Sequence, residues 1–168
     1  AFSSDGKHLA VANGCGFIEL RDAQSGKVIR MFSRHSGWSS SVTFSPNGKQ
    51  ILSAGGLSVA SKGNCILWDV QTGNRVRTFE AGEGTPSIIR TVAFSPDGRH
   101  LATASADGTA RVWGLPVARG AVRRTTYAGP ILDVALDSDA RYLATGGKDG
   151  ITSLWSRADG REHLRLEG

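Results

Sequence analysis

The stretch Val92–Trp113, with the sequence VAFSPDGRHLATASADGTARVW, decides the fold. It contains two turn signals. In Ser95–Gly98, proline presets φ at the second position, and glycine occupies a position where a side chain would clash. Asp107-Gly108 favours a tight hairpin. The stretch therefore predicts short strands at 92–94, 100–105 and 109–113, with a fourth strand after the loop at 114–120.

The same stretch recurs along the chain, and this repeat organises the whole sequence. Four apolar anchors are separated by 42, 50 and 42 residues: Phe2, Phe44, Phe94 and Leu136. A second column follows in register: Arg21, Trp68, Trp113 and Trp155. The second copy carries about five extra residues around Leu57–Ser61. Four strands per period of about forty residues, with no helical pattern, predict an all-β chain. The expected fold is a β-propeller of four-stranded antiparallel blades, with about four blades present.

The motifs Phe94–Gly98, Leu101–Thr109 and Val112-Trp113 resemble the WD-repeat family, named for a Trp-Asp pair that Trp68-Asp69 supplies. The resemblance covers essentially the whole chain. It implies a WD-repeat β-propeller segment over 1–168, with blades at about 1–32, 33–80, 81–127 and 128–168. Because the family's propellers usually close with about seven blades, the four copies are expected to form a partial ring or a fragment of a larger propeller.

Composition narrows the partner class and the compartment. The net charge is +5, but the basic residues are spread along the chain without interleaved aromatics, so no nucleic-acid partner is expected. No apolar run approaches the ~18 residues needed to cross a membrane, so no membrane association is expected. Cys15 and Cys65 fit neither a disulfide framework nor a metal site, which favours a reducing cytoplasm. The excess of arginine over lysine and the near-identical copies favour a bacterial source.

The repeat is an internal control on residues that could be catalytic. The counterparts of Asp97 are Asp5, Asn47 and Asp139, so an amide serves as well as a carboxylate. Those of His100 are His8, Gln50 and Tyr142, which is the variation of a solvent-facing surface position. Neither column keeps a general acid or base. The sequence predicts a protein that is not an enzyme, with no catalytic residue, metal or cofactor.

The family resemblance also implies a structural hydrogen-bond network in each blade. It joins a hairpin aspartate, a hydroxyl on the second strand, the tryptophan of the third strand and a histidine ahead of the first. In the third copy the matching positions are Thr85, where the histidine is expected, and Ser105, Asp107 and Trp113. The fourth copy supplies Asp149 and Trp155, and the second supplies His35 and Trp68. Gly55 and Gly147 stand at the expected hydroxyl position of the second and fourth copies, so no copy has the full set.

Loop variation predicts where binding occurs. In an antiparallel blade, the second-to-third and blade-to-blade connections share one face, and the copies differ most on that face. Arginine, tryptophan and tyrosine dominate interface hot spots. The candidate partner-binding residues are therefore Arg34, Trp38, Lys62, Arg90 and Tyr127. The alternative for Trp38 is a plug of the core where the chain enters the blade.

These observations predict a non-enzymatic scaffold that binds protein or peptide partners through the loop face of the propeller. One alternative is a regulatory or sensor propeller of a larger enzyme that contains a kinase or protease domain. Another is a propeller enzyme with a metal in the central channel, although the innermost strands offer only Asp133. Open blade ends would expose apolar faces, so self-association is also expected.

Overall fold

The structure, a computed structural model, describes residues 1–33, 35, 37–56, 63–80, 88–115, 123–126 and 129–167. Within the short strand at 123–126, only the side chain of residue 125 is described. The regular elements among these residues are all β-strands. They form one three-stranded and three four-stranded antiparallel sheets, each with its strands in chain order.

The first sheet contains β1 (His8–Ala12), β2 (Ile18–Asp22) and β3 (Val28–Phe32), and Phe2 adds an isolated bridge to Leu9. The second sheet contains β4 (Trp38–Phe44), β5 (Gln50–Gly56), β6 (Asn64–Asp69) and β7 (Arg75–Glu80). The third contains β8 (Ile89–Phe94), β9 (His100–Ser105), β10 (Thr109–Gly114) and β11 (Arg123–Thr126). The fourth contains β12 (Ile131–Leu136), β13 (Tyr142–Gly147), β14 (Ile151–Ser156) and β15 (Glu162–Glu167).

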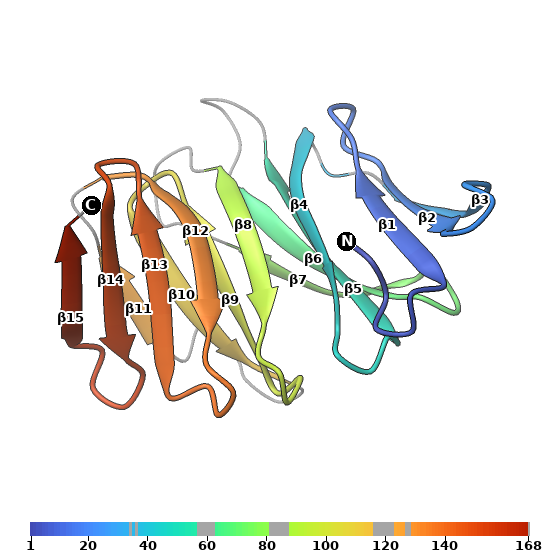
Figure 1. Cartoon of the computed structure of the whole chain (residues 1–168). Helices are drawn as coiled ribbons and strands as arrows, with labels where there is room; N and C mark the ends of the chain where they lie inside the picture. The colour runs from blue at the N-terminus through green and yellow to red at the C-terminus, as the bar shows by residue number, and fades with distance from the viewer. Residues whose placement is uncertain are drawn as a thin grey trace.

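The four sheets stand side by side like the blades of an incomplete propeller (Figure 1). The innermost strands β4, β8 and β12 are neighbours, and β1 lies beside β4. This arrangement confirms the predicted all-β fold and the partial propeller. The blade boundaries remain a proposal, and each sheet lies within one of the four proposed segments.

The turn Ser95–Gly98 and its counterparts in the other sheets are held by side chains as well as by the backbone. The Ser95 hydroxyl accepts from the His100 amide at 2.9 Å and donates to the Asp97 carboxylate at 2.5 Å. Asp97 also accepts from the Arg99 amide, and these bonds hold its pKa below the ordinary value. Asn47 makes the matching bonds in the second sheet. Asp97 is therefore a turn residue, and an amide can replace it.

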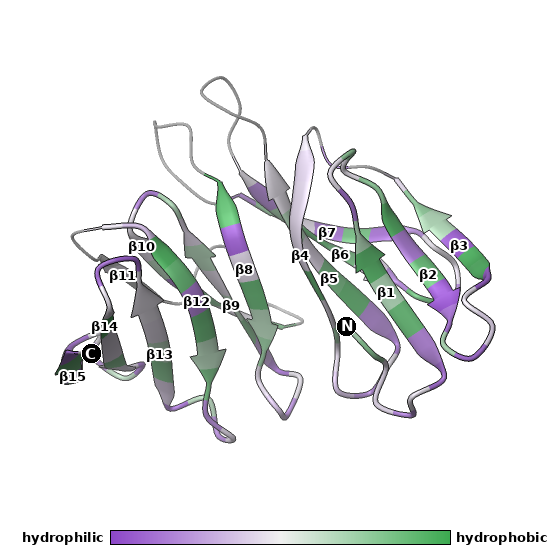
Figure 2. Ribbon diagram, turned by 45° about the horizontal axis from the view of Figure 1, so that its top comes forward, coloured by the Kyte–Doolittle hydropathy of each residue, from purple (hydrophilic) through white to green (hydrophobic). Residues whose placement is uncertain are grey.

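The core is divided among three seams, each between two neighbouring sheets. At the first seam, Trp68 packs on Phe32 with ring centroids 5.7 Å apart. At the second, Trp113 meets Phe79 edge to face at 5.3 Å. At the third, alanines of β9 and β10 receive the larger side chains of the fourth sheet, including Trp155. Figure 2 shows apolar stretches along β1, β5, β8 and β12, the strands that line these seams.

Contacts between a strand of one sheet and a turn of the next also join neighbouring sheets. The Arg30 guanidinium donates to the carbonyls of Gln71 and Thr72 at 2.9 and 3.0 Å. Arg157 Nη1 lies 2.7 Å from His100 Nε2. The prediction that His100 faces solvent is therefore wrong: its ring is half-buried between the third and fourth sheets. Burial and the neighbouring Arg157 cation lower its pKa.

We predict that Ile89→Ala destabilises the chain strongly, because Ile89 is fully buried at the seam between the second and third sheets. Leaving a cavity at a buried isoleucine costs about 2–5 kcal/mol of unfolding free energy. Urea denaturation followed by tryptophan fluorescence measures the change. Val76→Ala, at a side chain 53% exposed on β7, is the control and should shift stability by less than about 0.5 kcal/mol. Equal effects would contradict seam packing.

Candidate functional site

The connections of the sheets are sorted onto two faces, as strand alternation predicts. We define the loop face as the side that carries the blade-to-blade connections, the second-to-third-strand connections of the four-stranded sheets and the β1–β2 connection of the first sheet. It is the upper side in Figure 1, where β4, β8 and β12 begin. The opposite side carries the turn Ser95–Gly98, its counterparts in the other sheets, and the contacts of Arg30 and Arg157.

Each innermost strand carries a β-bulge near the loop face. The pairing register shifts between Ser39 and Ser41 in β4, between Ile89 and Thr91 in β8, and between Ile131 and Asp133 in β12. The residues between these pairs are Ser40, Arg90 and Leu132, which we call the bulge row; all three are exposed. A bulge re-aims a side chain without breaking the strand. Three consecutive blades therefore present one displaced side chain each.

A hydrogen bond joins two neighbouring blades beside the bulge row. The Ser40 hydroxyl donates to the Ile89 carbonyl at 2.5 Å, so β4 is bonded to β8 beside the bulge row. Trp38 begins β4 and is 68% exposed. It does not plug the core, so that alternative is wrong. Trp38, Arg90 and Leu132 offer an aromatic face, a cation and an aliphatic side chain at the loop-face ends of β4, β8 and β12.

The other predicted partner-binding residues, Arg34, Lys62 and Tyr127, lie outside the described residues, as does Thr85 of the predicted network. Trp38 and Arg90 lie at the loop-face ends of β4 and β8, and partner binding at these residues stays a prediction. Sequence reasoning missed Ser40 and Leu132. The only signal was their shared offset, four residues before the anchors Phe44 and Leu136, because serine, arginine and leucine have no common bulge chemistry.

A buried polar chain supports the loop face in the second sheet. Trp68 Nε1 donates to the Ser53 hydroxyl at 2.8 Å, and His35 Nε2 lies 2.7 Å from that hydroxyl. His35 Nδ1 lies 2.8 Å from Asn64 Oδ1. Asn64 Oδ1 can only accept, so His35 Nδ1 carries a proton and donates to it. In the neutral ring, Nε2 then accepts from the Ser53 hydroxyl, which itself accepts from the Trp68 indole. With a neutral His35, every member of this chain has a hydrogen-bond partner.

The His35 side chain is closely packed on all sides. The His35 side chain is 1% exposed, and a Cβ at Gly55 would lie 2.9 Å from its Cγ, so glycine is needed there. Burial lowers the His35 pKa, and the Asn64 contact opposes this shift. Asn64 carries no charge to pair with an imidazolium. The blade is therefore built around an uncharged ring.

The structure corrects the expected hydroxyl positions by two residues. Trp113 donates to Thr103 at 3.4 Å rather than to Ser105. Trp155 donates to Thr145 at 2.8 Å, and Ser53 serves Trp68, so Gly147 and Gly55 do not leave their networks without a hydroxyl. The indole reaches the residue diagonally opposite it on the adjacent strand. The position expected from the sequence is two residues further along that strand, roughly 6–7 Å beyond the diagonal residue. The signal was present: Ser53, Thr103 and Thr145 each lie nine residues after an anchor.

The hairpin aspartates act locally. Asp107 accepts from the Thr109 amide at 2.9 Å and from its hydroxyl at 2.6 Å, and Ser105 caps the same turn. Burial alone would raise the pKa of Asp107, but the Thr109 and Ser105 bonds hold it below the ordinary value. Asp149 accepts from the Ile151 amide at 3.1 Å. The structure brings Ser105 and Asp107 together but shows no bond from either to Trp113.

The first sheet departs from the other three. Arg21 stands in the tryptophan column and forms an ion pair with Glu19 at 2.6 Å.

Within the described part of the chain, no group of three or more histidine, cysteine or acidic side chains could hold a metal. Both cysteines are free thiols. No helix among the described residues is long and apolar enough to cross a membrane.

The repeat seen in this geometry also occurs in known proteins. The family model "WD domain, G-beta repeat" matches residues 26–69, 73–114 and 122–156. The chain is 29% identical over 133 residues to a guanine nucleotide-binding protein subunit beta of Saccharomyces cerevisiae, covering 78% of this chain and 30% of that protein. It is 38% identical over 114 residues to nuclear distribution protein PAC1 of Arthroderma otae, covering 66% and 24%. It is 32% identical over 121 residues to WD repeat-containing protein 1 of Xenopus tropicalis, covering 72% of this chain and 18% of that protein.

These sheets and repeats define a partial β-propeller. The chain belongs to the WD-repeat family, which confirms the resemblance found in the sequence. It spans about a third or less of the length of these curated relatives. Each match runs from the outermost strand of one sheet through three strands of the next, so the sequence repeat crosses a seam.

We predict that acidification weakens the fold through His35. Its folded pKa lies below the unfolded value of 6.5, so the full contribution is present above pH 6.5 and is lost as the pH falls below that value. The slope cannot exceed about 1.4 kcal/mol per pH unit for one group. Asn64→Asp supplies a carboxylate to the ring and should flatten the slope. Denaturant unfolding between pH 7 and 5 measures it.

The control for this prediction is His163→Gln, at an exposed site on β15. This variant should keep the wild-type slope. A wild-type stability that is flat between pH 7 and 5, or an unchanged slope in Asn64→Asp, would contradict the assignment of a neutral His35.

Proposed function

We propose that this chain is a non-enzymatic interaction scaffold that binds a peptide or protein segment across its loop face. The observation that carries the proposal is the bulge row together with the exposed Trp38. Rigid strands present these side chains, so little conformational entropy is lost on binding. WD-repeat membership and relatives such as the guanine nucleotide-binding protein subunit beta support a role in protein interaction.

The chemistry of the row defines the segment that would fit. Arg90 would pair with a carboxylate or another anionic group, and Trp38 and Leu132 would cover apolar side chains. The Ser40 hydroxyl already donates to Ile89, so it would act mainly as an acceptor. We expect an extended segment that combines one acidic and several apolar residues.

The proposal includes the absence of catalysis. On the described innermost strands, Asp133 is the single carboxylate, and its Oδ1 accepts from the Val134 amide at 2.8 Å. The cytoplasmic location and the lack of a nucleic-acid partner also remain part of the proposal. The named relatives are eukaryotic, so they give no support to a bacterial source. Self-association through the outer faces of the first and fourth sheets also remains part of the proposal.

We predict that peptides selected from a random display library on the wild-type chain bind Trp38→Ala and Arg90→Ala at least about tenfold more weakly, because central aromatic and arginine contacts dominate interfaces. Fluorescence anisotropy with the selected peptides measures the affinities. Phe2→Ala and Arg75→Ala, at exposed sites away from the loop face, are the matched controls and should bind as the wild type does. Peptides that bind all variants equally, or no enrichment over an unrelated bait, would refute the site.

A further inference from the structure

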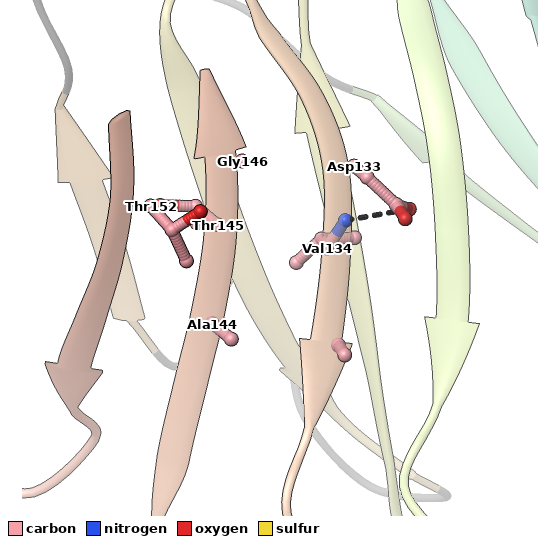
Figure 3. A pocket seen from close by; sticks show the side chains of 7 residues that line it. Asp133, Val134, Ala144, Thr145, Gly146 and Thr152 are labelled. Atoms are coloured by element: carbon pink, nitrogen blue, oxygen red, sulfur yellow. Dashed lines mark hydrogen bonds between the residues drawn. The ribbon is translucent and has the colours of Figure 1, made fainter. Parts of the chain in front are cut away.

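Two reactive groups of the sheets are engaged or buried. In the hollow on the fourth sheet, Asp133 Oδ1 accepts from the Val134 amide at 2.8 Å (Figure 3). The Cys65 thiol is fully buried, and burial raises its pKa. The hairpin that joins β1 to β2 is different, because it carries the dipeptide Asn13-Gly14 with the glycine exposed to solvent.

An asparagine that precedes glycine can react with its own backbone. Glycine has no Cβ, so nothing keeps its backbone nitrogen away from the carbonyl carbon of the asparagine side chain. The chain has four asparagines, and two of them precede glycine: Asn13 and Asn47. The structure treats these two sites differently.

The side-chain carbonyls do not distinguish the two sites. Asn13 Oδ1 accepts from the backbone amides two and four residues ahead, each at 3.0 Å. Asn47 Oδ1 accepts from the Ser45 hydroxyl at 2.8 Å and from the Lys49 amide at 3.0 Å. Each carbonyl is therefore held in place and polarised by two donors.

The glycine nitrogens do distinguish them. The Gly48 amide donates to the Ser45 carbonyl at 2.9 Å, and this bond closes the turn. The Gly14 amide is exposed and donates to no acceptor among the described residues. A Cβ built at Gly14 would meet nothing within 4 Å, so the space around this residue is open. The Gly14 nitrogen can therefore react without breaking a hydrogen bond, whereas the Gly48 nitrogen must first leave its turn.

We propose that Asn13-Gly14 is a self-modification site in the folded chain and that the turn protects Asn47-Gly48. The Gly14 nitrogen forms a bond to Asn13 Cγ, the Cγ–Nδ2 bond breaks, and the amide proton leaves with Nδ2 as ammonia. Water then opens the cyclic imide. Cleavage between the nitrogen and Cγ gives aspartate, and cleavage of the original peptide bond gives isoaspartate. The inference does not depend on partner binding at the loop face.

The two products affect the structure differently. Aspartate keeps Oδ1 as an acceptor, and its charge strengthens the bonds from the backbone amides. Isoaspartate lengthens the main chain by one methylene at Asn13, whose backbone carbonyl accepts from the amides of Gly16 and Ser39 at 3.0 and 3.4 Å. Gly16 has no room to shift, because even a Cβ there would collide with the Gly37 carbonyl oxygen. Isoaspartate therefore loosens the contact between this hairpin and the start of the second sheet.

Peptide mapping by mass spectrometry, after incubation of the wild-type chain in mildly alkaline buffer, tests the site. In the folded chain, Asn13 should convert to a mixture of aspartate and isoaspartate several-fold faster than Asn47, with release of ammonia. In denaturant both glycine amides are free, so the two sites should convert at similar rates. A folded chain in which Asn13 stays intact, or converts no faster than Asn47, would overturn the proposal.

Two variants separate the chemistry from its structural effect. Gly14→Ala has open space and a φ outside the left-handed region, so it should fold as the wild type does and lose the modification. Asn13→Asp reproduces the aspartate product and should keep the wild-type unfolding midpoint, whereas the separated isoaspartate fraction should unfold at lower denaturant concentration. Conversion of Gly14→Ala at the wild-type rate would overturn attack by the Gly14 nitrogen. Equal midpoints for the two products would overturn the structural effect.

Discussion

The packing of a tryptophan across the seam between neighbouring sheets is the interaction on which the rest of the structure depends. A four-stranded sheet that is apolar on both sides cannot bury itself, so each sheet needs a neighbour. Trp68 meets Phe32, and Trp113 meets Phe79, both in tilted or edge-to-face geometry that favours aromatic pairs. At the third seam, the column of Phe32 and Phe79 holds Thr125, so this column offers Trp155 no aromatic side chain. Because each family repeat crosses a seam, the covalent chain reinforces the same junctions.

Polar groups in this chain serve the packing. The indole of each seam tryptophan donates to a hydroxyl on the adjacent strand, which fixes the orientation of the ring: Ser53, Thr103 and Thr145. Carboxylates such as Asp97 and Asp107 accept backbone amides in turns. Residue types that are common in catalytic sites therefore have structural roles in this chain. The side chains left free for a partner are those that the bulges and the loop face present.

Periodicity was enough to predict the fold, because anchors and tryptophans recur in register and the turns have strong local signals. It was not enough for the details that depend on pairing between strands. The hydroxyl column was misplaced by two residues because Thr103 and Ser105 lie on the same side of β9, and strand alternation cannot tell them apart. The bulges at Ser40, Arg90 and Leu132 were missed because they arise from register shifts that no residue type marks. His100 was misjudged because its neighbour, Arg157, is 57 residues away in sequence.

A double-mutant cycle on Phe79 and Trp113 tests the central claim most directly. The single variants Phe79→Leu and Trp113→Phe and the double variant are compared in equilibrium unfolding. If neighbouring sheets pack through this pair, the two changes couple by about 0.5–1.5 kcal/mol, the value typical of aromatic pairs. Additive effects, with a coupling near zero, would contradict the claim that the seam tryptophans hold the blades together.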